Sequence, residues 1–254
     1  MILNSKIEGE GFPFIIIHGY MGMSDNWKSL ATKYATQGFQ IHALDLRNHG
    51  KSFHSDDFSY PAMVQDVVNY CAHHNITNAH FLGHSMGGKL VMFLAALYPQ
   101  LINKLIVADI APKYYTPHHQ TIMAALNAVD FSAKPSRAEV DQIMSEYISD
   151  FGTKQFLLKN LYWVEPGQLG FRFNLDVFNK NPEAIGEQIP ENTLFTGPTL
   201  FLRGDKSDYI LDSDFTDIHK HFPNAVIKDI SNAGHWVHAE NPEMFSHFVL
   251  DFLK

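Results

Sequence analysis

The sequence has one cysteine, an excess of acidic over basic residues and no long hydrophobic run. Cys71 has no partner for an intramolecular disulfide, and its place in an amphipathic helical pattern predicts a small buried side chain. Lys and Arg number 19 against 27 Asp and Glu, which gives a net charge of −8, and no basic cluster is available to neutralise phosphates. These absences argue against a disulfide framework, a nucleic-acid partner and an anionic membrane surface.

No segment approaches the roughly 18 consecutive apolar residues of a membrane-spanning helix. The first residues, MILNSKIEGEGF, also lack the apolar stretch of a signal peptide. We therefore expect a cytoplasmic protein with no membrane partner. Its 254 residues, 45% hydrophobic and 18% charged, suit one large globular α/β domain.

The first 110 residues alternate short apolar runs with amphipathic helical patterns. Runs of this kind are typical of strands that are buried on both faces of a parallel sheet, joined by right-handed helical crossovers. The predicted strands are 12–18, 39–46, 79–83 and 104–109, and the predicted helices are 25–37, 61–74 and 87–98.

The alternation stops after this region and resumes near the C-terminus. Between residues 111 and 188 we find helical patterns at 118–129, 136–150 and 154–161 and a Pro/Gly turn at 165–170, but no run typical of a parallel strand. Strands are predicted again at 198–203 and 225–230, with helices at 211–222 and 242–253. The sequence thus predicts a doubly wound, mostly parallel sheet built by residues 1–110 and 189–254, with a mostly helical insertion at 111–188.

Gly83-His84-Ser85-Met86-Gly87 lies between a predicted strand and a predicted helix. It fits the G-x-S-x-G pattern, in which a nucleophilic serine occupies a sharp turn and the flanking glycines relieve crowding. The five-residue pattern is weak evidence alone, but its place at a strand-to-helix junction makes it much more specific. We predict that Ser85 is a nucleophile; a serine that only caps the helix is the alternative.

The same stretch nearly matches a phosphate-binding loop. Residues 83–90 (GHSMGGKL) carry Leu90 where the hydroxyl that ligates magnesium should stand. We therefore do not predict nucleotide binding, and we expect Lys89 to be an exposed helix residue.

A general base that works near neutral pH points to histidine, and the chain has 15 of them. His235 follows the serine in chain order and lies on a loop after the last predicted strand, at the sheet edge where sites gather in α/β folds. We predict that it is the base, and that His238 is a supporting or surface residue. We predict no metal, because the pairs at 73/74, 118/119 and 235/238 lack matching carboxylates and no H-E-x-x-H motif occurs.

An oxyanion hole needs two N–H donors that tight turns hold in place before charge develops. The amide of Met86 follows the nucleophile at the start of a helix and is one candidate. The amide of Tyr20 in His18-Gly19-Tyr20, at the end of the first predicted strand, is the second. The alternative for Tyr20 is an ordinary turn at a strand end.

The acid that orients the imidazole has two possible locations. Asp109 ends the strand 104–109, where an unpaired carboxylate would be costly. Asp205 and Asp208 lie after the strand 198–203, the commoner location, but Ser207 occupies the position at which the acid often stands. We favour Asp109, keep Asp208 and Asp205 as alternatives, and expect Ser207 to hydrogen-bond near His235.

Five stretches together resemble the α/β-hydrolase superfamily, and specifically the YbfF-type serine esterases, a bacterial branch related to an animal mitochondrial serine hydrolase. They occur in the expected order along nearly the whole chain: HGYMG at 18–22, DLRNHGKS at 45–52, GHSMGGK at 83–89, DIAP at 109–112 and AGHWVHAE at 233–240.

This resemblance implies an α/β-hydrolase fold in which residues 111–188 form a cap over the site. It implies a serine carboxylesterase that uses no cofactor and hydrolyses short- to medium-chain acyl esters of small molecules. In this branch the acid is the aspartate of the DIAP stretch, here Asp109, with a serine on the later loop, here Ser207. The acidic pair Asp205 and Asp208 departs from the pattern and leaves a second acid open. An acyl-CoA thioesterase, a carbon–carbon hydrolase, a perhydrolase and a non-catalytic binding protein of the same fold are the alternatives.

Overall fold

The apolar runs of the sequence form one seven-stranded sheet in a computed structural model that describes residues 1–254. Six strands are parallel, and only β1 at one edge runs antiparallel to its neighbour. The predicted doubly wound, mostly parallel fold is therefore confirmed. In their order across the sheet the strands are β1 (Ser5–Glu8), β3 (Phe39–Leu44), β2 (Phe12–Ile17), β4 (Ala79–His84), β5 (Ile102–Ala108), β8 (Thr199–Gly204) and β9 (Ala225–Ile230).

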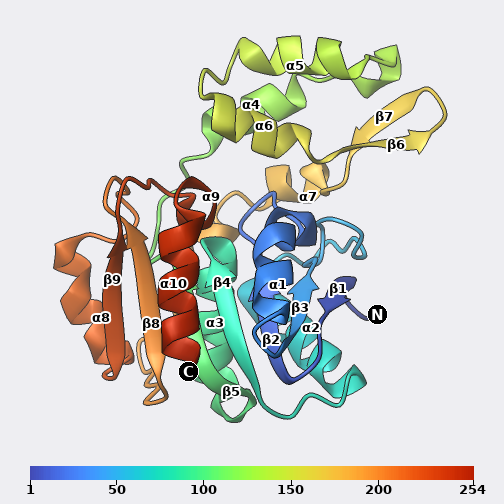
Figure 1. Ribbon diagram of the computed structural model, residues 1–254. Coiled ribbons are helices and arrows are strands. Elements are labelled where there is room, and N and C mark those ends of the chain that lie inside the picture. Colours follow the sequence, from blue (N-terminus) through green and yellow to red (C-terminus); the bar gives the residue numbers. More distant parts are fainter.

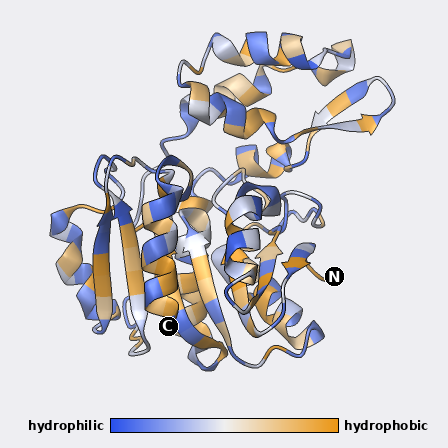
Figure 2. Ribbon diagram, in the orientation of Figure 1, coloured by the Kyte–Doolittle hydropathy of each residue, from blue (hydrophilic) through white to orange (hydrophobic).

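The central strands send alternate side chains to opposite faces of the sheet, as the pleat requires. In β2, Ile15 and Ile17 join one apolar cluster, whereas Phe14 and Ile16 join a second cluster on the other face. Both clusters are buried, which explains why these strands read as continuous apolar runs. Figure 2 shows this as hydrophobic colour along the central strands, in contrast to the mixed colouring of the outer helices.

Helices cover both faces. On one face, α1 (Lys28–Ala35), α10 (Pro242–Leu253) and the short helix α9 (Val237–Glu240) contribute to the cluster of Phe14 and Ile16. On the other face, α2 (Tyr60–His73), α3 (Met86–Leu97) and α8 (Phe215–His221) contribute to the cluster of Ile15 and Ile17. No helix has the length and apolar character that crossing a bilayer requires.

The segment between β5 and β8 forms a separate layer above the carboxyl ends of the parallel strands (Figure 1). Its buried side chains, such as Leu126, Met144 and Phe178, join the same apolar cluster as α2 and α3, so this layer packs on the core. Its elements are α4 (Gln120–Asn127), α5 (Arg137–Ser145), α6 (Phe151–Leu158), β6 (Leu161–Glu165), β7 (Gln168–Phe171) and α7 (Leu175–Lys180). We call this layer the cap, and the predicted boundaries 111–188 enclose all of it.

Several elements were not predicted. Strand β1 was missed because Ser5–Glu8 (SKIE) is mostly exposed and has no apolar run. In the cap, the Pro/Gly turn is the tip of an antiparallel β6–β7 hairpin, with Gly167 at φ 81° where a glycine avoids the strain of a left-handed backbone. The short helix α7 was also missed, and the helix expected to reach residue 150 ends at Ser145.

Candidate active site

Ser85 occupies the turn between β4 and α3 with φ 54° and ψ −118°, a backbone conformation that a serine rarely adopts. The turn closes so tightly that a Cβ on Gly83 would meet the carbonyl oxygen of Gly87 at 2.1 Å, and a Cβ on Gly87 would meet the carbonyl oxygen of His18 at 2.5 Å. Any larger residue at 83 or 87 would therefore clash with the backbone, so both positions require glycine. The strain holds the hydroxyl of Ser85 at the sheet edge that faces the cap.

His235 lies on the loop between β9 and the short helix α9 (Val237–Glu240), within hydrogen-bond distance of the serine. Its Nε2 is 2.9 Å from Ser85 Oγ, and its Nδ1 is 2.8 Å from Asp109 Oδ2. Because Nδ1–H donates to the carboxylate, Nε2 is free to accept the serine proton. Burial lowers the pKa of His235 to about 3, and nearby His118 acts in the same direction, so the imidazole is neutral near pH 7.

Two further contacts fix the plane of the imidazole. The ring of Tyr209 stacks on it with 3.7 Å between centroids and 15° between planes. On the other side, His84 Nε2 lies 2.7 Å from the carbonyl oxygen of His235, where a protonated Nε2 donates a hydrogen bond. The ring is therefore held in one orientation before any substrate binds.

Asp109 follows β5, and its side chain is completely buried. Beside the imidazole, it accepts hydrogen bonds from the Ser207 hydroxyl at 2.5 Å and from the Gly204 amide at 3.1 Å. Burial raises the pKa of Asp109 to about 7, and the bonds from Ser207 and Gly204 oppose that shift. The predicted hydrogen bond of Ser207 near His235 thus goes to the carboxylate that His235 contacts.

The other two acid candidates lie away from the imidazole. Asp205 is exposed and accepts from the backbone amide of Ala233 at 3.1 Å. Asp208 is exposed and makes no hydrogen bond or ion pair. Of the three carboxylates considered, only Asp109 contacts His235.

The two residues whose amides are expected to bind an oxyanion come from neighbouring strand ends. Met86 is the first residue of α3, and Tyr20 lies on the loop that follows β2, the neighbour of β4 in the sheet. The loop of Tyr20 passes close to the serine, because a Cβ on Gly19 would lie 3.3 Å from the Cβ of Ser85. Tyr20, Ser85 and Met86 border the same pocket.

Three adjoining hollows lie between the core and the cap, and Tyr20 and His119 border all three. The first hollow is the pocket that contains Ser85 and Met86, and it is bordered by Ile110, Tyr115, Ile185 and Tyr209. The second contains His84, Ser85 and His235, and it is bordered by Ile122, Phe156 and Trp236. The third runs on from Ile185 along α4 and α7. Apolar walls with a few polar groups are typical of a small-molecule site.

His119 is a site residue that the sequence did not reveal. In the sequence, His119 stood out only as a member of the pair 118/119, which lacks the carboxylates of a metal site. In the structure its half-buried ring borders the same hollows as Ser85 and has no hydrogen-bond partner in the protein. Burial lowers the pKa of His119 to about 3. A neutral imidazole in these hollows can offer one donor and one acceptor to a bound molecule.

One expectation about a side chain near the site was wrong. Lys89 is fully buried, because the chain entering the cap folds over the start of α3; its ammonium donates to the carbonyl of Lys113 and lies 5.0 Å from the ring centre of Tyr115. Burial lowers the pKa of Lys89 to about 7. His238 has the first of its two expected roles, that of a supporting residue: its ring is buried, stacks on Trp27 with 4.2 Å between ring centres and packs against His84.

The chain is similar to known proteins over almost its whole length. Residues 13–133 match the alpha/beta hydrolase fold family. Esterase YbfF of Escherichia coli is 39% identical over 245 residues, which cover 95% of this chain and 93% of that protein. The sn-1-specific diacylglycerol lipase ABHD11 of Mus musculus is 37% identical over 246 residues, which cover 94% of this chain and 80% of the relative.

A solved structure described as a marine microorganism esterase is 40% identical and superimposes with a TM-score of 0.96, and the match covers 99% of both chains. Identity at this level along the whole chain shows more than a shared fold. The chain therefore belongs to the α/β-hydrolase superfamily, and within it to the carboxylic ester hydrolases that include esterase YbfF.

Proposed function

We propose that this esterase cleaves short- to medium-chain acyl esters of small molecules with Ser85 as nucleophile, His235 as base and Asp109 as the acid that orients the base. The observation that carries the proposal is the continuous hydrogen-bonded series from Ser85 Oγ to His235 to Asp109, with separations of 2.9 and 2.8 Å. A neutral imidazole with a free Nε2 at the nucleophile is what acyl transfer from an ester requires.

In the proposed reaction, Ser85 Oγ attacks the acyl carbonyl while His235 Nε2 takes its proton. The negative charge that develops on the carbonyl oxygen is stabilised by the backbone amides of Tyr20 and Met86. His235 then gives the proton to the departing alcohol oxygen, and the acyl group remains on Ser85. A water molecule, activated by the same imidazole, releases the acid and restores the serine.

The two hollows that reach Ser85 differ in their contact with His235, and this difference indicates which hollow binds the acyl chain and which binds the alcohol. The protonated imidazole must reach the oxygen of the leaving alcohol, so the alcohol belongs beside His235. His235 borders the second hollow and not the first. We therefore assign the alcohol to the hollow of Ile122 and Phe156, and the acyl chain to the hollow of Ile110 and Ile185.

Labelling and turnover of the purified protein test the proposal. A fluorophosphonate probe should label the wild-type chain, and the Ser85→Ala variant should lose both the label and ester turnover, by about four orders of magnitude or more. A series of p-nitrophenyl esters of increasing acyl length, with matched acyl-thioesters, measures the chain preference and separates an esterase from a thioesterase. Persistent turnover in Ser85→Ala would refute the assignment of the nucleophile.

A further inference from the structure

The loop that carries the Tyr20 amide is a tight turn in an unusual conformation. Gly22 N–H donates to Gly19 O at 3.0 Å, which closes the turn, and Met21 at its third position has φ 59°. A methionine rarely adopts this left-handed backbone, and rotating the central peptide of such a turn would relieve it. The conformation persists only if the surrounding groups hold it. We call Gly19–Gly22 the oxyanion turn.

Two buried side chains hold the backbone of Met21. Its N–H donates to Nε2 of His49 at 3.1 Å, and its carbonyl accepts from Nδ2 of Asn160 at 2.9 Å. His49 and Asn160 are 0% and 1% exposed, so water does not compete for these bonds. The two peptide groups that flank Met21 are therefore each fixed by a separate side chain.

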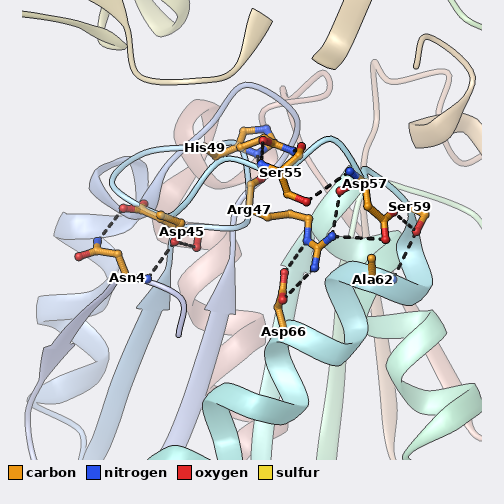
Figure 3. Close-up of polar contacts among 11 residues, drawn as sticks. Asn4, Asp45, Arg47, His49, Ser55, Asp57, Ser59, Ala62 and Asp66 are labelled. Carbon is orange, nitrogen blue, oxygen red and sulfur yellow. Dashed lines mark hydrogen bonds and ion pairs between the residues drawn. The ribbon is translucent and has the colours of Figure 1, made fainter. Parts of the chain in front are cut away.

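His49 is held in the state that can accept this bond. Its Nδ1–H donates to the carbonyl of Arg47 at 2.9 Å, which leaves Nε2 as the acceptor. Burial keeps the pKa of His49 well below its usual value, and neighbouring His18 acts in the same direction, so Nε2 stays unprotonated. Arg47 is itself anchored by two bonds to Asp66, of 2.6 and 2.9 Å, and by one to the carbonyl of Asp57 (Figure 3).

Asn160 belongs to the cap, where it lies between α6 and the hairpin. The backbone carbonyl of Asn160 accepts a hydrogen bond from the backbone amide of Arg172 at 3.0 Å, which connects Asn160 to the end of the hairpin. Its Nδ2 faces the carbonyls of Met21, Phe156 and Leu157, so only the NH2 end of the amide can point toward the turn. One donor of the cap thus reaches the loop that carries a proposed catalytic amide of the core.

We propose that Asn160 and His49 are positioning residues for the oxyanion turn, so that the seating of the cap on the core sets the rate of the chemical step. This inference rests on the proposed role of the Tyr20 amide. The bond to His49 holds the central Tyr20–Met21 peptide of the turn, and the bond from Asn160 holds the Met21–Gly22 peptide. Losing either bond lets the turn relax, and the adjoining Gly19–Tyr20 peptide then presents the Tyr20 N–H to the developing oxyanion less well. Ground-state binding of the ester, which depends on the hollows, is unaffected.

The decisive comparison is Asn160→Ala against Asn174→Ala. Asn174 also joins cap to core, through Nδ2 to Asn48 Oδ1 at 3.2 Å, but it does not contact the oxyanion turn. We expect Asn160→Ala to lower kcat for p-nitrophenyl butyrate about tenfold with KM within about twofold, because a misaligned donor costs less than the 10²–10³-fold of a deleted one. Asn174→Ala should change kcat by less than about twofold, while thermal unfolding shows whether the two variants lose similar stability.

Phenylboronic acid supplies a second readout, because its tetrahedral adduct with Ser85 places an oxygen where the oxyanion forms. Its affinity should fall about as much as kcat in Asn160→Ala and remain unchanged in Asn174→Ala. An unchanged kcat in Asn160→Ala, or an equal loss in Asn174→Ala, would overturn the proposal. Failure of the proposed function itself would appear earlier and differently, as turnover that survives Ser85→Ala.

His49 provides an independent test if Asn160→Ala fails to fold. His49→Gln keeps an acceptor for the Met21 amide, and His49→Ala removes it. We expect His49→Ala to show the same loss of kcat and of boronate affinity, with His49→Gln intermediate between it and wild type. Identical kinetics for the two His49 variants would contradict a positioning role.

Discussion

The core and the cap of this esterase differ in where they place polar and apolar side chains. In the core, every residue of the hydrogen-bonded series follows a strand: Ser85 follows β4, Asp109 follows β5 and His235 follows β9. The cap is made of short helices and a hairpin, and it leaves large apolar side chains in solvent, with Phe151 72% and Trp163 56% exposed.

The two regions also differ in how they are fixed. Core strands are joined by continuous ladders of backbone hydrogen bonds, whereas the polar contacts between cap and core are isolated hydrogen bonds, among them Asn160 to Met21, Asn174 to Asn48 and Tyr60 Oη to Ile185 O. Binding and catalytic groups are most accurate on rigid elements. From this difference we expect core substitutions near the site to change the rate and substitutions that line the hollows of the cap to change selectivity, with Asn160, which holds the oxyanion turn, as the cap residue that acts on the rate.

The largest expected effect comes from the buried acid of the core. Asp109→Asn keeps the size of the side chain but replaces the acceptor for Nδ1–H, so we expect kcat/KM to fall by about 10³–10⁴-fold. Asp208→Asn is the matched control, because Asp208 is an exposed carboxylate on the alternative loop, and it should stay within about twofold of wild type. A larger loss in Asp208→Asn than in Asp109→Asn would move the acid to the later loop.

The next effect concerns the pH dependence of the core. In the proposed reaction the neutral imidazole of His235 is the active form, and burial lowers its pKa to about 3, so activity is expected above that pKa and should be lost as pH falls through it. We expect the titration of His235 alone to change kcat/KM less than about twofold between pH 7 and 6, so a larger decrease there would come from protonation of Asp109, whose pKa burial raises to about 7. Asp109→Asn removes this second titration, and half-maximal residual activity of that variant at or above pH 6.5, the usual pKa of histidine, would contradict the burial argument.

Acid also acts on folding, and this contribution must be separated from the activity profile. Burial lowers the pKa of His18, His49, His84 and His238, so the unfolded chain binds protons that the folded chain does not. The free energy of unfolding should therefore fall as pH drops below 6.5. Asp109 acts in the opposite direction, because its raised pKa favours the folded state as pH falls from 7 toward 4, but it is one group against several. Circular dichroism at each pH identifies the range in which the enzyme is still folded.

The two regions also differ in how much of their structure could be predicted from the sequence. Ser85 could be predicted because the turn needs glycine at 83 and 87 through local contacts, and such needs leave a sequence pattern. Asp109 was favoured over Asp208 and Asp205 because it ends an apolar strand, because Ser207 occupies the usual position of the acid on the later loop, and because the related family has its acid in the DIAP stretch. The buried state of Lys89 and the place of His119 could not be predicted, because they depend on where the cap folds back over α3, and tertiary packing of that kind leaves no local period.

The third effect tests the cap's role in selection. Ile185→Phe narrows the hollow assigned to the acyl chain, and Ile122→Phe narrows the hollow assigned to the alcohol. We expect Ile185→Phe to reduce kcat/KM for octanoate esters about tenfold while acetate esters stay within about twofold, since overpacking costs on the order of 1–3 kcal/mol. Ile122→Phe should reduce kcat/KM for acetate esters of long alcohols more than for acetate esters of short alcohols. The reversed pattern would exchange the two hollows.

The smallest effect is expected at the apolar surface of the cap. Phe151 has no packed environment to lose, so Phe151→Ser should leave ester turnover unchanged and alter the free energy of unfolding in urea by no more than about 0.5 kcal/mol. Phe14→Ala is the contrasting variant in the core, because Phe14 is 0% exposed and its removal should cost about 3–5 kcal/mol. A cost above about 1 kcal/mol for Phe151→Ser would mean that this side chain is covered in solution. The cap would then bury apolar surface as the core does, and the contrast between the two regions would fail.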